Sequence, residues 1–470
     1  MNAVPRFLSG VLACIGIAGL AQAGAAGVVK LPPFERHELA NGAVLVLMEK
    51  HDTPLVALSA VLRGGALEDA PGREGTAALL AELTQKGAGK RNAAQFAEAV
   101  EGAGGQLGAT AGIERSGVGA SFLARDVDLM IELVSDALMR PQLDAAEFEK
   151  VRTLAIQSIA AAKDSDPSGL IGEYGDAWLF RGHPYGRAAA GDERSLAAVT
   201  LDDVKRYYAA QARGDRLILA VVGDFKAADM KRRLETAFGG WAAGRSPLPV
   251  VMAAPRVEGR RVLLVDKPGS TQTYFWLGNV GASRTDPERT SQSVVNTVFG
   301  GQFTSMLNTE LRIKSGLTYG AGSGFDRLAQ PGAFRISSFT QAAKTAEAID
   351  LALATLDRLH AEGLTDAALA SARSYMLGQF PPTLETNGQL AGRLAEMVFY
   401  DLGTQDVNEF AARVMAVDPA RARTTIDASF PRSGDLAMVL IGDAAAIRDA
   451  ARKYGPVTEM KITDPWFAPR

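Results

Sequence analysis

The chain has 470 residues, a formal net charge of −3, and a composition of 47% hydrophobic and 22% charged residues. The length is too great for one ordinary domain and predicts two or three. The nearly balanced charge, without a run of like charges, argues against binding to nucleic acid or to an acidic membrane surface.

The first 23 residues have the three-part layout of a secretory signal peptide. Residues 1–6 carry one positive charge, residues 7–20 are apolar, and Ala21-Gln22-Ala23 forms a small-x-small cleavage site. An N-terminal helix or a membrane anchor is the alternative, but this stretch is shorter than the roughly 20 apolar residues that a membrane span needs. The layout predicts an exported mature chain with no membrane span.

Cys14 is the only cysteine and lies inside this segment. Residues 11–14 loosely resemble a lipid-attachment site, but the apolar stretch continues beyond Cys14 and is followed by the small-x-small site. We therefore expect cleavage rather than lipidation, and a mature chain without disulfide or thiol chemistry.

A long and degenerate repeat runs through the rest of the chain. Four anchors recur in the same order at separations of 216–219 residues: 63–66 with 279–282, 121–122 with 338–339, 198–200 with 416–418, and 217–224 with 436–443. A unit of this length is too long for a solenoid repeat, so it indicates a duplicated domain.

Within each unit the apolar pattern alternates between strand and helix periods. In the first unit, strands are expected at residues 44–47 and 55–58, and helices at 75–83, 127–139, 148–162 and 202–210. Because helices and strands mix without strict β-α-β regularity, the predicted fold class is α+β. We expect two homologous domains, 34–245 and 256–460, joined by a proline-rich linker at 246–255. Each domain is expected to be an antiparallel-rich mixed sheet with helices packed on one face.

Several short motifs support a resemblance to a known family. They are Leu39-Ala40-Asn41-Gly42, Arg63-Gly64-Gly65-Ala66-Leu67-Glu68-Asp69, His183-Pro184-Tyr185-Gly186, residues 296–319, and the two Gly-Asp strand ends. In this order and spacing, across residues 34–457, the chain resembles the insulinase/pitrilysin family of inverted zincin peptidases. The resemblance implies a duplicated α+β unit of about this size.

Active members of that family carry a His-x-x-Glu-His helix after the Gly-Gly strand, and a Glu on a later helix completes the zinc site. Aligned on this pattern, the chain has Ala78 and Glu82 at the histidine positions, Ala81 at the general base and Ser158 at the third ligand. The resemblance therefore implies a chain that is catalytically inactive on its own and holds no metal or other cofactor.

The histidines offer no substitute for this motif. The chain has four, His37, His51, His183 and His360, and no two lie within five residues of each other. A pair of imidazoles on one helical turn is therefore excluded. His183 belongs to the His-Pro-Tyr-Gly turn, where we expect a structural role.

The second unit retains a motif of different chemistry. In the family's second domains an Arg-x-x-x-Gly-x-x-Tyr element faces the zinc and grips the substrate backbone; here it corresponds to Arg312, Gly316 and Tyr319. A guanidinium and a phenol are donors suited to a carbonyl oxygen that gains negative charge. We expect a helix to end near Gly316, a strand to carry Tyr319, and both side chains to face a cavity. The alternative is that Arg312 pairs with Glu310 and that Tyr319 is a core residue.

The resemblance implies a non-catalytic, substrate-binding subunit of an exported heterodimeric zinc metallopeptidase that degrades peptides. A homologous zinc-binding catalytic subunit would be its partner, and the periplasm its location. The alternative is a structural or scaffold protein of the same fold with no role in proteolysis, which the export signal weighs against. An active enzyme with unrecognised metal ligands is a third hypothesis, which the histidine inventory argues against.

Overall fold

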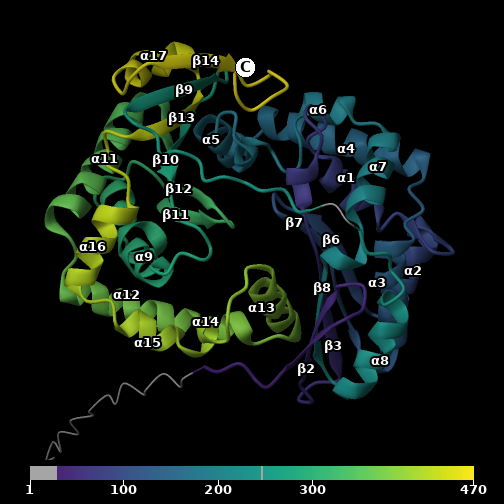
Figure 1. Cartoon of the computed structure of the whole chain (residues 1–470). Helices are drawn as coiled ribbons and strands as arrows, with labels where there is room; N and C mark the ends of the chain where they lie inside the picture. The colour runs from purple at the N-terminus through teal and green to yellow at the C-terminus, as the bar shows by residue number, and fades with distance from the viewer. Residues whose placement is uncertain (1–28, 245–246, 470) are drawn as a thin grey trace, which may run out of the picture.

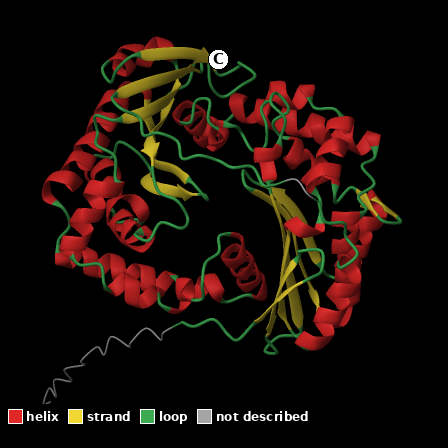
Figure 2. Cartoon of the chain, viewed as in Figure 1, coloured by secondary structure: helices red, strands yellow, loops and turns green. Residues whose placement is uncertain are grey.

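The computed structural model describes residues 29–244, here called the first half, and 247–469, the second half. The predicted signal peptide at 1–23, Cys14 and the first residue of the predicted linker lie outside the described residues. Each half contains one six-stranded sheet, and the two halves face each other around a central space in the ribbon view (Figures 1 and 2).

The sheet of the first half has the order β1-β2-β8-β3-β7-β6. Only the pair β2 and β8 is parallel, and the other pairs are antiparallel. The strands are β1 (Glu35–Glu38), β2 (Val44–Glu49), β3 (Leu55–Arg63), β6 (Gln106–Ala111), β7 (Arg115–Leu123) and β8 (Leu217–Gly223). A small separate hairpin is formed by β4 (Gly87–Ala88) and β5 (Arg91–Asn92).

The sheet of the second half has the corresponding order β14-β9-β13-β10-β12-β11, with two parallel pairs, β9 with β13 and β9 with β14. Its edge strand beside β9 comes from the C-terminal end of the chain, whereas β1 precedes β2. The strands are β9 (Arg260–Asp266), β10 (Gln272–Val280), β11 (Ala321–Arg327), β12 (Pro331–Gln341), β13 (Leu436–Gly442) and β14 (Val457–Lys461). The predicted α+β fold of two duplicated units with antiparallel-rich mixed sheets is confirmed.

The strands also show how far the two units are displaced along the chain. β3 and β10 each have 9 residues and start at Leu55 and Gln272, which are 217 positions apart. Arg63 is therefore equivalent to Val280, and the spacing of 216 that matched it with Asn279 was wrong by one residue. β8 and β13 start 219 positions apart, at Leu217 and Leu436, as predicted.

The outer face of each sheet is covered by helices of its own half. In the first half, the helices on or next to this face are α1 (Thr76–Leu83), α2 (Ala93–Gly102), α3 (Val127–Met139), α4 (Ala145–Asp164), α6 (Glu193–Ala198), α7 (Leu201–Gln211) and α8 (Ala227–Phe238). In the second half they are α9 (Arg289–Asn296), α10 (Met306–Asn308), α11 (Thr345–Glu362), α12 (Asp366–Gln379), α14 (Gln405–Asn408), α15 (Phe410–Met415), α16 (Pro419–Ser429) and α17 (Ala444–Arg452).

The inner face of each sheet is partly covered by one helix from the opposite half. α13 (Asn387–Phe399), from the second half, packs Leu390 and Leu394 on β3 and β8, while α5 (Ile171–Leu179), from the first half, packs Tyr174 and Trp178 on β10 and β13 (Figure 1). Both faces of β8 and β13 are thus covered, which is why every residue of these strands is buried. Each sheet therefore has helices on both of its faces, whereas the prediction placed helices on one face only.

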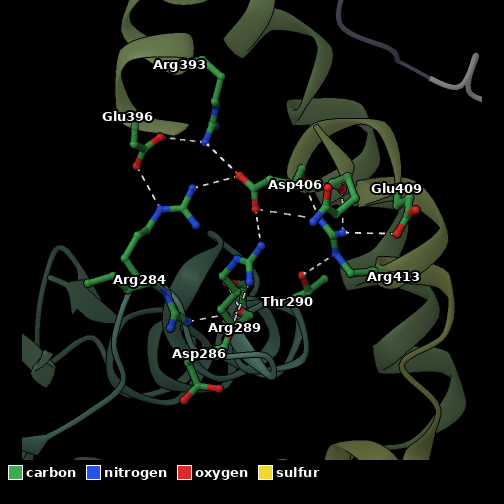
Figure 3. Close-up of polar contacts among 12 residues, drawn as sticks. Arg284, Asp286, Arg289, Thr290, Arg393, Glu396, Asp406, Glu409 and Arg413 are labelled. Carbon is green, nitrogen blue, oxygen red and sulfur yellow. Dashed lines mark hydrogen bonds and ion pairs between the residues drawn. The ribbon is translucent and has the colours of Figure 1, made fainter. Parts of the chain in front are cut away.

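An ion-pair network anchors α13 to its own half (Figure 3). The Asp406 carboxylate, with a side chain only 7% exposed, lies 3.1 Å from a nitrogen of Arg284 and also contacts Arg289 and Arg393. Glu396 of α13 accepts hydrogen bonds from Arg284 at 2.9 Å and Arg393 at 2.8 Å. Burial alone would raise the pKa of Asp406, but the hydrogen bond from Arg289 and the charge of Arg284 lower it. The network therefore fixes the helix that reaches across to the other sheet.

A single buried carboxylate joins the two halves. Glu114, 7% exposed, accepts hydrogen bonds from the hydroxyls of Tyr185 at 2.5 Å and Tyr400 at 3.1 Å, and from the N–H of Ala329 at 3.0 Å. Glu114 and Tyr185 belong to the first half, and Ala329 and Tyr400 to the second. Each oxygen of this carboxylate is therefore satisfied by groups that meet only when the halves are docked.

Residues 247–259 connect the halves without forming a helix or a strand. In residues 29–244 and 247–469, no helix has both the length and the apolar character needed to cross a membrane.

Candidate functional site

The positions that correspond to the metal-binding motif lie on α1. The helix packs its apolar side on the first half, with Leu79, Leu80 and Leu83 buried, while Ala78 is half-buried and Glu82 is exposed. The helix is thus formed by ordinary core packing. Ala78, Ala81 and Glu82 together offer one carboxylate and no imidazole, a set that does not fit the usual zinc ligands.

The start of α1 is held by a buried acid from the Gly-Gly-Ala-Leu-Glu-Asp motif. The two carboxylate oxygens of Asp69 accept the backbone N–H groups of Gly75 at 2.8 Å and Ala77 at 2.9 Å. These are unsatisfied donors at the helix N-terminus, so Asp69 caps the helix from a distance in sequence. Burial raises the pKa of Asp69 to about 7 despite these hydrogen bonds. The motif therefore fixes the start of the helix that carries Ala78, Ala81 and Glu82.

A cavity of about 470 Å³ lies beside the former ligand positions. Ala78, Ala81 and Glu82 of α1 line it together with Leu154 and Ala155 of α4. Ser158 lies one turn further along α4, on the same helical stripe as Leu154, and its side chain is exposed. The structure therefore brings three of the four degenerate positions to one cavity, and Ser158 lies beyond the part of α4 that lines it.

The four histidines lie in four separate places and have other partners. His51 contacts Asp224 and Glu49, and His37 contacts Glu35. The imidazole of His183 lies 2.7 Å from the carbonyl of Met252 and accepts the N–H of Tyr185, and His360 is buried against the carbonyl of Pro431. Within the described parts of the chain, no group of three or more His, Cys, Asp or Glu side chains is placed to hold a metal ion. His183 has the structural role that its turn predicted.

Arg312 lies in a π-helical turn, Thr309–Lys314. Its guanidinium carbon is 4.7 Å from the centre of the Phe303 ring, which is itself 61% exposed. Glu310 is bound by Lys314 at 2.9 Å and Arg358 at 2.9 Å, and these cations, Lys314 first, lower its pKa. The alternative in which Arg312 pairs with Glu310 is therefore wrong, and the in-plane donors of the stacked guanidinium stay accessible.

Tyr319 is 81% exposed, so its assignment to the core is also wrong. It does not lie in a strand as expected but two residues before β11 starts at Ala321. The chain turns at Gly316, whose φ is 65°, in the left-handed region that glycine adopts easily. The N–H groups of Leu317 and Thr318 then donate to the carbonyl of Leu311 at 2.9 and 3.3 Å, which folds this segment back over the helical turn.

The backbone on both sides of Tyr319 is pinned to β12. The carbonyl of Leu317 accepts the hydroxyl of Thr340 at 2.7 Å, and the carbonyl of Gly320 accepts that of Ser338 at 2.8 Å. An exposed phenol on a fixed backbone is a pre-organised donor, because little conformational freedom of the main chain is lost when it binds. Arg312 and Tyr319 thus occupy one folded segment and leave their donors open.

Two exposed apolar side chains near these positions were not predicted from the sequence, Phe303 under Arg312 and Leu154 in the wall beside α1. Leu154 is 64% exposed although it is large and apolar. In the sequence, Leu154 appears as an aliphatic residue on the polar face of a helix. A single exposed aliphatic residue is common, and it indicates a binding surface only when several of them form a patch.

Two family models match consecutive parts of the chain. The family model described as "Insulinase (Peptidase family M16)" matches residues 44–193, and the model described as "Peptidase M16 inactive domain" matches residues 198–376. The chain belongs to the insulinase family, peptidase family M16, and lacks the zinc ligands expected of its active members.

Relatives and solved structures agree with this assignment. Uncharacterised zinc proteases of Mycobacterium leprae and Streptomyces coelicolor are each 27% identical, over 68% and 76% of this chain and 72% and 79% of their own length. A non-peptidase homologue of Helicobacter pylori is 24% identical over 73% of this chain and 78% of its own. A crystal structure of a peptidase M16 inactive domain from Pseudomonas fluorescens shares the fold, with a TM-score of 0.82 and 22% identity over 87% of this chain and 98% of that one.

Proposed function

We propose that this chain is the non-catalytic, substrate-binding subunit of an exported, periplasmic two-chain zinc peptidase that degrades peptides. A homologous chain with an intact His-x-x-Glu-His helix would supply the zinc, and this chain would supply Arg312 and Tyr319. The proposal rests on one contrast. The first half carries Ala78 and Glu82 at the former ligand positions, whereas the second half holds two accessible donors on a pinned backbone.

The role of the two donors follows from their chemistry. In the composite site, a zinc ion held by the His-x-x-Glu-His helix of the partner would supply an activated water. The Arg312 guanidinium and the Tyr319 hydroxyl donate to the oxygen of the scissile carbonyl. As water adds to the carbonyl carbon this oxygen gains negative charge, so the two donors bind the transition state more strongly than the ground state.

Other observations support peptide as the substrate class. β6 is an edge strand, hydrogen-bonded to β7 on one side only, and Ala109–Ala111 of this strand line the cavity beside α1. An edge strand can accept an extended peptide through main-chain hydrogen bonds. The names of the mycobacterial and Streptomyces relatives as zinc proteases agree with a role in proteolysis.

The test is reconstitution with a homologous chain that carries His-x-x-Glu-His, followed by peptide turnover. Tyr319→Phe removes one donor to the developing charge, and loss of such a donor costs about 100-fold or more in turnover. Tyr375→Phe, on α12, removes the hydroxyl of another exposed tyrosine and serves as the matched control. Pairing of the two chains, measured by sedimentation, should be the same for all three proteins.

The scaffold alternative is kept because the Helicobacter relative is described as a non-peptidase homologue. If Tyr319→Phe and Arg312→Ala both leave the turnover of the pair unchanged, the retained motif is structural and the scaffold assignment is correct. If no zinc-carrying homologue pairs with this chain, the two-chain peptidase is rejected.

A further inference from the structure

A second cavity, of about 750 Å³, shares no lining residue with the cavity beside α1 and is lined by neither Arg312 nor Tyr319. It is bounded by the loop after α5, by Asp192 at the start of α6, and by the C-terminal segment after β14. Arg181, Arg187 and Trp466 are among its lining residues, and we call it the arginine cavity. The C-terminal segment is attached there, because the carbonyl of Pro465 accepts the N–H of Arg194 at 3.2 Å (Figure 1).

The loop that carries Arg181 and Arg187 is rigid. It contains the His-Pro-Tyr-Gly turn, in which His183 is hydrogen-bonded at both ring nitrogens and Tyr185 is bound to the buried Glu114. The rings of Phe180, His183 and Tyr185 lie 5.0–6.0 Å apart, centre to centre. The turn therefore fixes the main chain on both sides of it, and the two arginines project from fixed backbone positions.

Among the residues that the structure describes, these arginines have no anionic partner. The guanidinium of Arg181 lies 3.4 Å from the centre of the Trp178 ring, and that of Arg194, at the edge of the cavity, lies 5.7 Å from Trp466. Across residues 29–244 and 247–469, the side chains of Arg181, Arg187 and Arg194 make no hydrogen bond or ion pair. A guanidinium stacked on an indole keeps its N–H groups free in the guanidinium plane. Two of these parallel donors match the oxygens of a carboxylate or a phosphate.

Two carboxylates also line the arginine cavity, but both accept local hydrogen bonds. Asp192 accepts the N–H of Ser195 and caps α6, and Glu74 accepts the N–H of Gly72 at 3.1 Å. The two lining arginines and the two carboxylates therefore balance in charge, but the carboxylates are engaged locally whereas the guanidinium groups of Arg181 and Arg187 are not. Burial, and after it the nearby charge of Arg261, lower the pKa of Arg181.

We propose that the arginine cavity binds an oxyanion, a phosphate or carboxylate group, carried on a flat apolar body. The guanidinium groups of Arg181 and Arg187 take the oxyanion, and the indole of Trp466 packs against the body. This site is separate from the proposed peptide site, so either can be correct without the other.

The test is calorimetric titration of the mature chain at low salt with four compounds. Phenyl phosphate and benzoate combine an oxyanion with a flat apolar body, inorganic phosphate has the oxyanion alone, and benzyl alcohol has the body alone. We expect phenyl phosphate or benzoate to bind at least about 10-fold more tightly than inorganic phosphate, because the ring buries apolar area. Whichever of the two aromatic anions binds more tightly identifies the group as phosphate or carboxylate.

The variants locate the site. Arg187→Gln should weaken binding about 10-fold or more, since it removes charge-assisted hydrogen bonds. Arg181→Lys keeps the positive charge but removes the planar pair of N–H donors of the guanidinium, so it should also weaken binding. Arg232→Gln, an exposed arginine on α8, is the control and should have no effect. The inference is overturned if no compound binds at about 10 mM, if benzyl alcohol binds as well as the anions, or if both cavity variants bind like the wild type.

Discussion

Glu114 should be the most important polar residue for the docking of the two halves. Replacing it with alanine removes the acceptor for the hydroxyls of Tyr185 and Tyr400 and for the N–H of Ala329. Each buried donor left without a partner costs about 1–3 kcal/mol. Because the three donors share one carboxylate and water can reach part of the junction, we expect a total loss of roughly 3–6 kcal/mol.

Scanning calorimetry measures this loss. For domains of 150–250 residues, about 1 kcal/mol shifts Tm by roughly 2–4 °C, so Glu114→Ala should lower Tm by roughly 6–24 °C. Glu132→Ala removes a carboxylate from an exposed ion pair with Arg91 and should change stability by less than about 1 kcal/mol. A Glu114→Ala Tm within about 2 °C of the wild type would refute the assignment of this carboxylate as the junction of the halves.

Three further predictions concern the metal site, the pH dependence and the export signal. Introducing Ala78→His, Ala81→Glu, Glu82→His and Ser158→Glu together should yield a chain that retains about one zinc after dialysis, because α1 and α4 already share a cavity; retention equal to that of the unmodified chain would contradict this geometry. Burial raises the pKa of Asp176 to about 8, above its unfolded value of about 3.9, so the stability present at low pH is lost as pH rises from about 4 to about 8. Asp176→Asn should therefore melt several degrees higher than the wild type at pH of about 8.5, with the difference shrinking toward pH 4, and parallel melting curves at all pH values would argue against this. Mass spectrometry of the protein from its native source should show the first two dozen or so residues missing, as a signal peptide requires, and an intact N-terminus would exclude cleavage.

Much of the candidate site could be read from local sequence. The degenerate positions Ala78, Ala81 and Glu82 fall on one helix because apolar residues recur at helical spacing, and the structure places all three at one cavity. The turn at Gly316 was also predictable, since glycine takes a positive φ without steric cost. Ser158 was harder to place, because a position on a second helix depends on how that helix is rotated against the first.

The partners of the retained motif could not be predicted from the sequence. Glu310 and Arg312 are neighbours in the chain, but Glu310 pairs with Lys314 on the next turn and with Arg358 on α11, which leaves Arg312 to stack on Phe303. Charge partners are chosen by three-dimensional proximity and by the geometry of long side chains, and spacing along the chain constrains them only within one helix.

The duplication and the α+β class could be predicted from the chain alone, because both depend on residue type and local period, and the resemblance to the insulinase family implied the loss of the metal ligands. The exchange of α5 and α13 between the halves became visible only in the folded chain. An amphipathic helix records in its sequence that it has an apolar face, but not which of two similar sheets will cover that face. The same holds for Glu114, whose burial depends on hydroxyls more than 70 and 280 positions away. The contacts of Glu114 with Ala329 and Tyr400 form only when the halves dock, since a lone carboxylate would otherwise stay in water.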